Sequence, residues 1–195
     1  MPNKADNYYT DLKRLIDTIV VKDEHGNELS FSDGVDSATK IVLSQTSSGH
    51  KLIFIGNGGS AAISSHMATD FWKTGGMQAI AFNDPSLLTC ISNDYGYSHV
   101  FEKPIEMFAN AGDVLVAISS SGNSDNILRG LEAARAKQCK LITLSAFDLD
   151  NPLRSLGHLN FYVASHLYGH VEIIHSSICH CILDIIIKNK LNTKK

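Results

Sequence analysis

The 195-residue sequence lacks several features that would point to a particular partner or environment. It has no excess of basic residues, since 17 Lys and Arg stand against 20 Asp and Glu, so its net charge of −3 does not indicate nucleic-acid binding. The N-terminal region has no apolar signal core, and we find no apolar run long enough to span a bilayer. We therefore expect a soluble, cytoplasmic protein without a membrane partner.

Cysteines are also few, and their positions exclude further classes of protein. Cys90, Cys139, Cys179 and Cys181 show no secreted disulfide spacing, so we expect reduced thiols. Cys179 and Cys181 flank His180, but no second Cys/His cluster completes a structural zinc site.

No low-complexity segment or proline-rich linker divides the chain, and 44% of its residues are hydrophobic, enough for one full core. We expect one domain over residues 1–195. A helical segment occupies residues 1–50, and an α/β core with a terminal helix occupies residues 51–195.

The chain does contain alternating apolar strands and helices. Expected strands are Lys51–Gly56, Met77–Phe82, Asp113–Ser119, Lys140–Ala146 and Leu159–Ser165, with a further short apolar segment at Leu87–Asp94. Expected helices are Tyr8–Val21, Ser37–Ser48, Ser60–Lys73, one starting or interrupted near Pro104, Asp125–Lys137 and about His170–Lys190. This order predicts a three-layer α/β/α sandwich with a central parallel five-stranded sheet, N-terminal helices and a long C-terminal helix.

Two Gly/Ser loops follow strands of this sheet. The first reads GNGGSAA from Gly56, and the second reads ISSSGNSDN from Ile118. Hydroxyls and the N-terminus of a following helix can hold a phosphate without a cation, although an ordinary serine-capped turn gives the same pattern. Neither loop has the Walker or dinucleotide-binding spacing. Because ligands bind beyond the carboxyl ends of parallel strands, two such loops favour a phosphate site.

Two groups of metal-ligating side chains lie on separate helices. His66 and Asp70 are one helical turn apart and share a face, as a chelating pair or as part of a solvated surface. At ~100° per residue, one arc of the terminal helix carries a polar stripe. The stripe consists of Glu172, His175, Ser176, Cys179 and His180. Either these groups bond to each other and to a neighbouring helix, or they form an active-site wall that brings Glu172 and His180 to His66 and Asp70.

These motifs occur in the order found in sugar isomerase (SIS) domains. GNGGSAA, His66, NDYGY at Asn93–Tyr97, GDVLVAISSSGNSDNILRGLEAAR and a terminal helix with His180 resemble the phosphoheptose isomerase branch of that family. The similarity runs from about Lys51 to Ile187. It implies interconversion of sedoheptulose 7-phosphate and a heptose 7-phosphate through an enediol, for surface polysaccharide or capsule.

The same resemblance implies the residues of the site. It places the substrate against Asn57, Gly58, Gly59, Ser60, Asn93, Asp94, Ser119, Ser120, Ser121, Ser124 and Glu172. It implies a zinc ion on His66, Asp70, Glu172 and His180, with Asp70 and His180 as the proton-transfer pair. His175 is expected either behind the ligands or as an ordinary hydrogen-bonded residue. The resemblance also implies a homotetramer whose active sites lie between subunits.

The chain departs from the family pattern at the site. Asp70 stands where the family has glutamate, which retracts the carboxylate by ~1.5 Å, and Glu172 stands where it has glutamine. Residues 71–78 are shorter than the family segment and leave Lys73 as the nearby cation. Tyr168 and Gly169 stand where an acidic residue is common.

Two other functions are therefore weighed against phosphoheptose isomerase. One is an isomerase or epimerase of another phosphosugar. The other is a non-catalytic SIS protein that binds a sugar phosphate or a protein partner, against which the acidic and imidazole groups of both helices argue.

Overall fold

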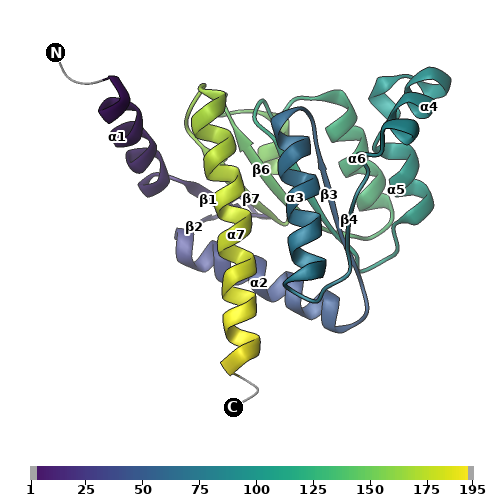
Figure 1. The fold of residues 1–195 in the computed structure, drawn as a ribbon, viewed down its shortest axis with the longest axis horizontal. Coiled ribbons are helices and arrows are strands. Elements are labelled where there is room, and N and C mark those ends of the chain that lie inside the picture. The colour runs from purple at the N-terminus through teal and green to yellow at the C-terminus, as the bar shows by residue number, and fades with distance from the viewer. Residues whose placement is uncertain (1–3, 193–195) are drawn as a thin grey trace.

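A seven-stranded sheet with the order β2-β1-β7-β6-β5-β3-β4 lies at the centre of the computed structural model, which describes residues 4–192 (Figure 1). The five strands from β7 to β4 are parallel, as expected, whereas β1 pairs antiparallel with both β7 and β2. The strands are β1 (Val20–Asp23), β2 (Glu28–Leu29), β3 (Leu52–Gly56), β4 (Ala79–Ala81), β5 (Val114–Ser119), β6 (Lys140–Ala146) and β7 (Leu159–Val163). The predicted α/β class is confirmed, and the sheet has two strands more than the five expected.

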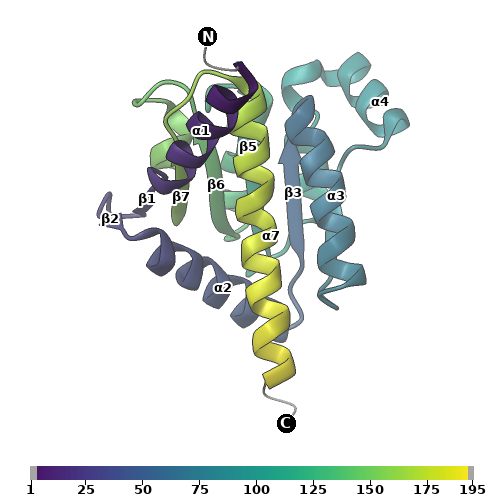
Figure 2. The same cartoon turned by 60° about the vertical axis from the view of Figure 1, so that its left-hand side comes forward.

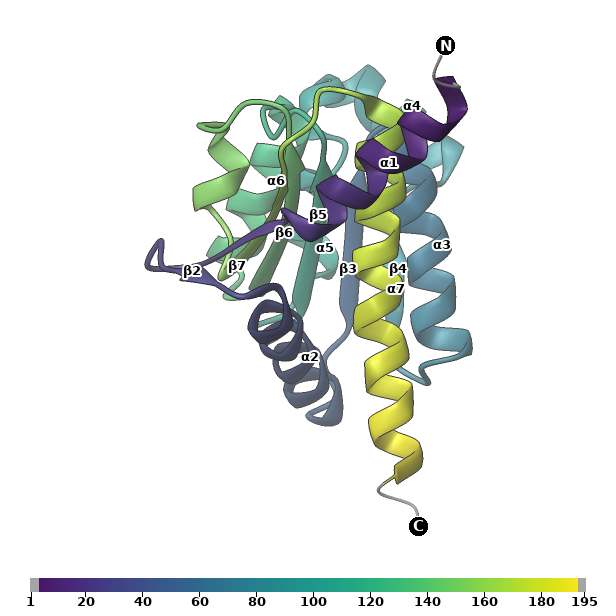
Figure 3. The same ribbon diagram turned by 90° about the vertical axis from the view of Figure 1, so that its left-hand side faces the viewer.

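Helices cover both faces of the sheet. One layer contains α1 (Lys4–Asp17), α2 (Phe31–Ser47), α3 (Gly59–Lys73) and α7 (Tyr168–Asn192). The other contains α4 (Pro85–Tyr95), α5 (Glu102–Phe108), α6 (Asp125–Ala136) and the short 3-10 helices η1 (Tyr97–His99) and η2 (Pro152–Ser155). Figure 2 shows α2, α7 and α3 in front of the sheet with α4 on its far side, and Figure 3 shows α1 crossing near the start of α7.

The alternation of side chains along β3 explains the two layers. Leu52 and Phe54 pack into the core with α2, α3 and α7, while Ile53 and Ile55 pack into the core with α5 and α6. All four side chains are almost completely buried. A strand buried on both faces has no polar alternation, which is why the sequence shows a continuous apolar run there.

The N-terminal segment differs from its prediction. The expected helix Tyr8–Val21 ends at Asp17, and Val20 and Val21 instead belong to β1. The following polar stretch forms a tight turn, in which the Asp23 carboxylate accepts hydrogen bonds from the backbone N–H groups of His25 and Asn27. Asp23 thereby closes the hairpin between β1 and β2 and adds both strands to the sheet.

The short apolar segment at Leu87–Asp94 is helical and lies within α4. Asp84 is the N-cap, and its carboxylate accepts a hydrogen bond from the backbone N–H of Leu87 at 3.0 Å. Pro85 occupies the first helical turn, where its missing N–H has no cost. This Asp-Pro start signal outweighs the apolar run that follows it.

The terminal helix α7 corrects two expectations. By length and composition it is apolar enough to cross a membrane, so the statement that no run has this length was wrong. Its buried apolar residues pack in the core shared with α2 and α3, which accounts for the apolar composition of the helix within the fold.

The polar stripe of α7 also divides between two faces. His175 and Cys179 are buried in the protein interior, whereas Glu172, Ser176 and His180 remain partly exposed. Burial raises the pKa of the Cys179 thiol to about 12. Since the arc is wider than one helix face, its far edge packs toward the sheet instead of forming an active-site wall. The alternative for His175, an ordinary hydrogen-bonded residue of the helix, fits its position.

His175 predicts a pH-dependent stability. Its Nε2 lies 3.2 Å from the carbonyl oxygen of Ser145, its Nδ1 has no partner among the described residues, and burial lowers its pKa from 6.5 to about 4. Below about pH 6.5 the unfolded chain gains a proton that the folded ring does not take up, so stability falls as pH drops towards 4. We expect this residue to remove about 2 kcal/mol of unfolding free energy between pH 7 and pH 5.

Urea unfolding at several pH values measures this dependence. In His175→Gln the loss of unfolding free energy between pH 7 and pH 5 that His175 causes should vanish, because the amide does not titrate. The matched control is His25→Gln, at an exposed position of the hairpin, which should keep the pH dependence of the parent. Parallel pH curves for the parent and His175→Gln would contradict the assignment.

Candidate active site

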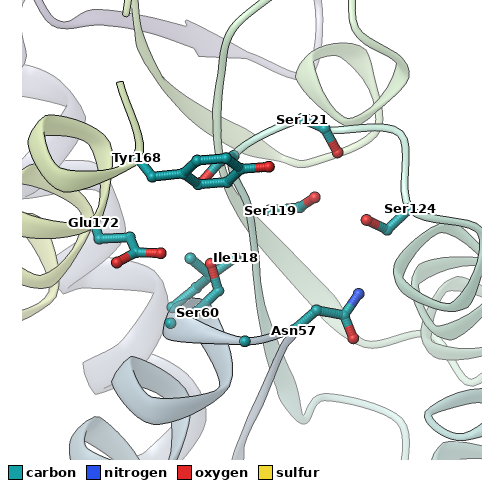
Figure 4. Close-up of a pocket in the computed structure, with 11 residues that line it drawn as sticks. Asn57, Ser60, Ile118, Ser119, Ser121, Ser124, Tyr168 and Glu172 are labelled. Carbon is teal, nitrogen blue, oxygen red and sulfur yellow. The ribbon is translucent and has the colours of Figure 1, made fainter. Parts of the chain in front are cut away.

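A pocket of about 240 Å³ lies where β3 and β5 end at the carboxyl edge of the sheet. Figure 4 shows its side chains converging from the loop after β3, the loop after β5 and the start of α7. The lining residues are Asn57, Gly58, Gly59, Ser60, Ile118, Ser119, Ser120, Ser121, Ser124, Tyr168 and Glu172. The structure therefore brings together both predicted Gly/Ser loops and Glu172.

The pocket offers neutral donors without a cation among its lining residues. α3 begins at Gly59 and α6 begins at Asp125, directly after two residues of the lining, so the positive ends of both helices face the same space. The N-cap Ser124 makes no side-chain capping hydrogen bond, which leaves its hydroxyl for a ligand. Hydroxyls and unpaired helix N–H groups are the donors that bind phosphate at helix N-termini.

Backbone hydrogen bonds fix the shape of the serine loop, residues 119–124. The N–H of Gly122 donates to the carbonyl oxygen of Ser119 at 3.1 Å, and its own carbonyl accepts from Leu153 at 3.1 Å. The carbonyl of Ser120 accepts from the N–H of Ala146 at 3.0 Å. Gly122 has φ +61°, and a Cβ there would overlap the side chain of Asn151, so only glycine fits.

Asn126 is a residue of the site that the sequence prediction missed. Its buried amide pairs reciprocally with that of Asn57: each Nδ2 donates to the other Oδ1 at 2.9 Å. The hydroxyl of Tyr97 also donates to Asn57 Oδ1 at 3.1 Å. These contacts fix the orientation of Asn57 in the pocket. Only the position of Asn126 at the start of α6, beside the serine loop, could have signalled this role.

His66, Asp70 and His180 form a second group of polar side chains at the contact between α3 and α7. One ligand atom from each residue lies within 4.8 Å of the others. His66 Nε2 is 3.4 Å from Asp70 Oδ2, and the rings of His66 and His180 have centroids 5.3 Å apart. Two imidazoles and one carboxylate at this separation fit a divalent transition metal. Three of the four predicted ligands are therefore together.

Glu172, the fourth predicted ligand, does not belong to this group. Its carboxylate lies against Gly59 at the pocket, so closely that a Cβ at residue 59 would overlap it. Glu172 precedes His180 by eight residues, which at 1.5 Å per residue is ~12 Å along the helix axis. The geometry supports Glu172 as a wall of the pocket and gives no support to it as a ligand.

Three other expected residues lie away from the pocket lining. Asn93 and Asp94 are on α4, where Asn93 Nδ2 donates to Asp94 Oδ1 at 2.9 Å. Lys73 ends α3, 14 residues after Gly59, or ~21 Å along the axis. Within one chain Lys73 therefore lies at the far end of α3 from the pocket, three residues after Asp70.

The pocket and the metal-ligating group are aligned along the same two helices. α3 and α7 run side by side (Figure 1) and touch at three levels: Gly59 with Glu172, His66 with His180, and Gly75 with Lys190. Gly59 and His66 are seven residues apart, so the two parts of the site are separated by ~10 Å along α3. An extended ligand could contact both.

Comparisons with known proteins agree on one family. The model of the SIS domain family matches residues 7–146. The phosphoheptose isomerase of Citrifermentans bemidjiense is 37% identical over 162 residues, covering 80% of this chain and 84% of that protein. The Vibrio cholerae phosphoheptose isomerase is 36% identical over 162 residues, covering 79% of this chain and 83% of that protein.

Solved structures show the same similarity. The phosphoheptose isomerase of Neisseria gonorrhoeae superimposes with a TM-score of 0.82 at 29% identity, covering 94% of this chain and 97% of that chain. The Francisella tularensis phosphoheptose isomerase gives a TM-score of 0.82 at 26% identity, covering 95% of this chain and 97% of that chain.

The amide pair predicts the effect of removing Asn126. In Asn126→Ala the Asn57 amide loses its partner, so we expect affinity for inorganic phosphate to fall ~5-fold and unfolding free energy to fall by about 1–2 kcal/mol. Isothermal titration calorimetry and urea unfolding measure the two effects. Asn123→Ala, exposed in the same loop and outside the lining, is the control. Equal phosphate affinity in the parent and Asn126→Ala would show that Asn126 does not position the site.

Proposed function

The chain belongs to the SIS domain family, and we propose that it is a phosphoheptose isomerase that converts sedoheptulose 7-phosphate to D-glycero-D-manno-heptose 7-phosphate. One observation carries the proposal: a pocket lined by serine hydroxyls and the starts of two helices lies one level above a His/Asp/His group on the same pair of helices, α3 and α7. The identity of 36–37% to phosphoheptose isomerases over most of the chain supports the same reaction.

The separation of the two levels suits a long substrate. From C1 to phosphorus a heptose 7-phosphate has six C–C bonds and two bonds through oxygen, a contour of ~12 Å at ~1.5 Å per bond. This contour is comparable with the ~10 Å that separates the pocket level of Gly59 from the level of His66 along α3. Shorter sugar phosphates reach that level less well, which favours a heptose over a pentose.

The reaction transfers hydrogen between two neighbouring carbons. A base takes a proton from C1 of the ketose while an acid protonates the carbonyl oxygen on C2, which gives an enediol. The hydroxyl on C1 then loses its proton as C2 gains one on carbon, and the aldose forms with no net change in atoms. We assign Asp70 and His180 as the acid/base pair of these steps, and the serine loop, with Ser119, Ser121 and Ser124, as the anchor of the distal phosphate.

The donor set of His66, Asp70 and His180 suits zinc. A zinc ion held there would polarise the C2 carbonyl oxygen and stabilise the developing oxyanion. The imidazoles of His66 and His180 and the carboxylate of Asp70 would hold it. In this proposal Glu172 contacts the sugar from the side of α7.

The resemblance supports three further parts of the proposal. The chain acts as one SIS domain, it resides in the cytoplasm, and it forms a homotetramer in which neighbouring subunits complete each active site. Exposed apolar side chains on the two helices, Ile173 beside Glu172 on α7 and Trp72 near the end of α3, are suited to such contacts.

Turnover with a panel of ketose phosphates from pentose to heptose tests the reaction. We expect the highest kcat/KM with sedoheptulose 7-phosphate. Asp70→Asn and His180→Ala should each lower kcat by ~100-fold or more, since each changes an acid/base group that is also a proposed zinc ligand, with phosphate affinity retained. Ser121→Ala and Ser124→Ala should raise KM instead. Full turnover in either acid/base variant would refute the assignment, and preference for another sugar phosphate would identify a different phosphosugar isomerase.

Metal analysis tests the ligand group without using activity. Protein purified without added metal should contain zinc, and His66→Ala and His180→Ala should contain ~10-fold less, because a tetrahedral site needs its protein ligands. Ser121→Ala, in the phosphate loop, is the control and should retain the parent's zinc content. Equal zinc in the parent and both histidine variants would exclude this group as the site.

A further inference from the structure

Tyr168 lies at the pocket without an assigned role. It is the first residue of α7, lines the pocket with the serines and Glu172, and is 62% exposed. Its hydroxyl has no hydrogen-bond partner among residues 4–192, whereas the other tyrosine close to the loops, Tyr97, donates to Asn57. Figure 4 shows the ring extending from α7 across the pocket, with the hydroxyl directed to the side of Ser119 and Ser121.

We propose that Tyr168 closes the phosphate subsite, donating its phenolic hydrogen to the bound phosphate, and that Phe147 is the positioning residue that holds its ring over the serine loop. This inference rests on the proposed function for the substrate, but the phosphate contact itself does not require isomerisation. A neutral phenol adds a donor without adding charge, in keeping with the hydroxyls opposite it.

The contact between Phe147 and Tyr168 supports the positioning role. Their rings meet edge to face, with centroids 5.0 Å apart and planes at 79°. Phe147 also stacks on His166, with ring centroids 5.4 Å apart and planes at 18°. An edge-to-face contact favours one orientation of the tyrosine ring over free rotation into solvent.

The backbone of Phe147 is itself held in an unfavourable conformation. Phe147 has φ +58°, a left-handed value that costs energy for a residue with a bulky side chain. Its N–H donates to the carbonyl of Ser165 at 3.2 Å, and its carbonyl accepts from the Tyr162 hydroxyl at 2.8 Å. Such strain persists where surrounding contacts determine it, and here both backbone groups are bonded.

The same segment is also tied to the serine loop. Ala146, directly before Phe147, donates its N–H to the carbonyl of Ser120 at 3.0 Å. The residue that bonds to the serine loop, Ala146, and the residue that contacts the Tyr168 ring, Phe147, are therefore neighbours in the chain. This connection links the position of the Tyr168 ring to that of the serine loop.

Calorimetric titration of inorganic phosphate into the purified protein tests the inference. Tyr168→Phe removes only the hydroxyl and should raise the Kd of inorganic phosphate ~10-fold, the loss of one hydrogen bond to a charged group. In turnover the KM for the sugar phosphate should rise by a similar factor while kcat changes less than ~3-fold. Tyr9→Phe, at an exposed position of α1, is the matched control and should leave both values unchanged.

Phe147 is tested by a pair of variants in the same titration. Phe147→Leu loses the ring and should raise the phosphate Kd, whereas Phe147→Tyr keeps the ring and should restore the parent value. Circular dichroism and the thermal midpoint check that both variants are folded. Equal phosphate Kd in Phe147→Leu and Phe147→Tyr would overturn the positioning role.

The outcomes separate this inference from the proposed function. An unchanged phosphate Kd in Tyr168→Phe, with a raised Kd in Ser121→Ala, would overturn the role of Tyr168 and leave the phosphate site in place. If Tyr168→Phe raises the phosphate Kd but the parent protein shows no isomerase activity, the subsite is supported and the isomerase proposal is refuted. Unchanged Kd in both variants would refute the phosphate site and the role of Tyr168 together.

Discussion

The site depends on the register between α3 and α7. Contacts at Gly59 with Glu172, His66 with His180 and Gly75 with Lys190 hold the two helices parallel along their length. Because the register is maintained at both ends, one choice of alignment places the carboxylate of Glu172 at the pocket and the His180 ring beside His66. A slip of one turn would separate both pairs at once. The core side chains beneath α3 and α7 therefore position the site residues.

The parallel sheet provides the second constraint, because it gathers distant segments at one edge. The loops after β3 and β5 and the start of α7 are far apart in sequence, but all reach the pocket. The end of β6 and the 3-10 helix η2 support the serine loop through the bonds from Ala146 to Ser120 and from Leu153 to Gly122. In this arrangement the apolar strands set the distances and the polar loops supply the donors, so substitutions in loops can alter recognition without disturbing the core.

How much the sequence could predict depended on whether a signal was local. Strand β6 and the start of α6 were predicted because an apolar run and a Ser-Asp helix start are local signals. The helix α4 was missed because its start signal, Asp84 and Pro85, precedes the apolar residues on which the prediction of a short apolar segment rested. Within the site, the serine loop and the His66/Asp70 pair followed from spacing. Asn126, Tyr168 and the separation of Glu172 from the metal-ligating group depend on tertiary contacts between α3, α6 and α7, which no local pattern encodes.

The two edge strands of the sheet affect the tendency of the chain to self-associate at high concentration. Its outermost strands, β2 (Glu28–Leu29) and β4 (Ala79–Ala81), are two and three residues long, while the long apolar strands lie inside. An outer strand offers unpaired N–H and C=O groups to any neighbouring chain, and a short one offers few. The β1–β2 hairpin thus covers β7, an apolar strand that would otherwise be the edge of the sheet. The short edge strands leave few backbone groups through which chains could pair into fibrils.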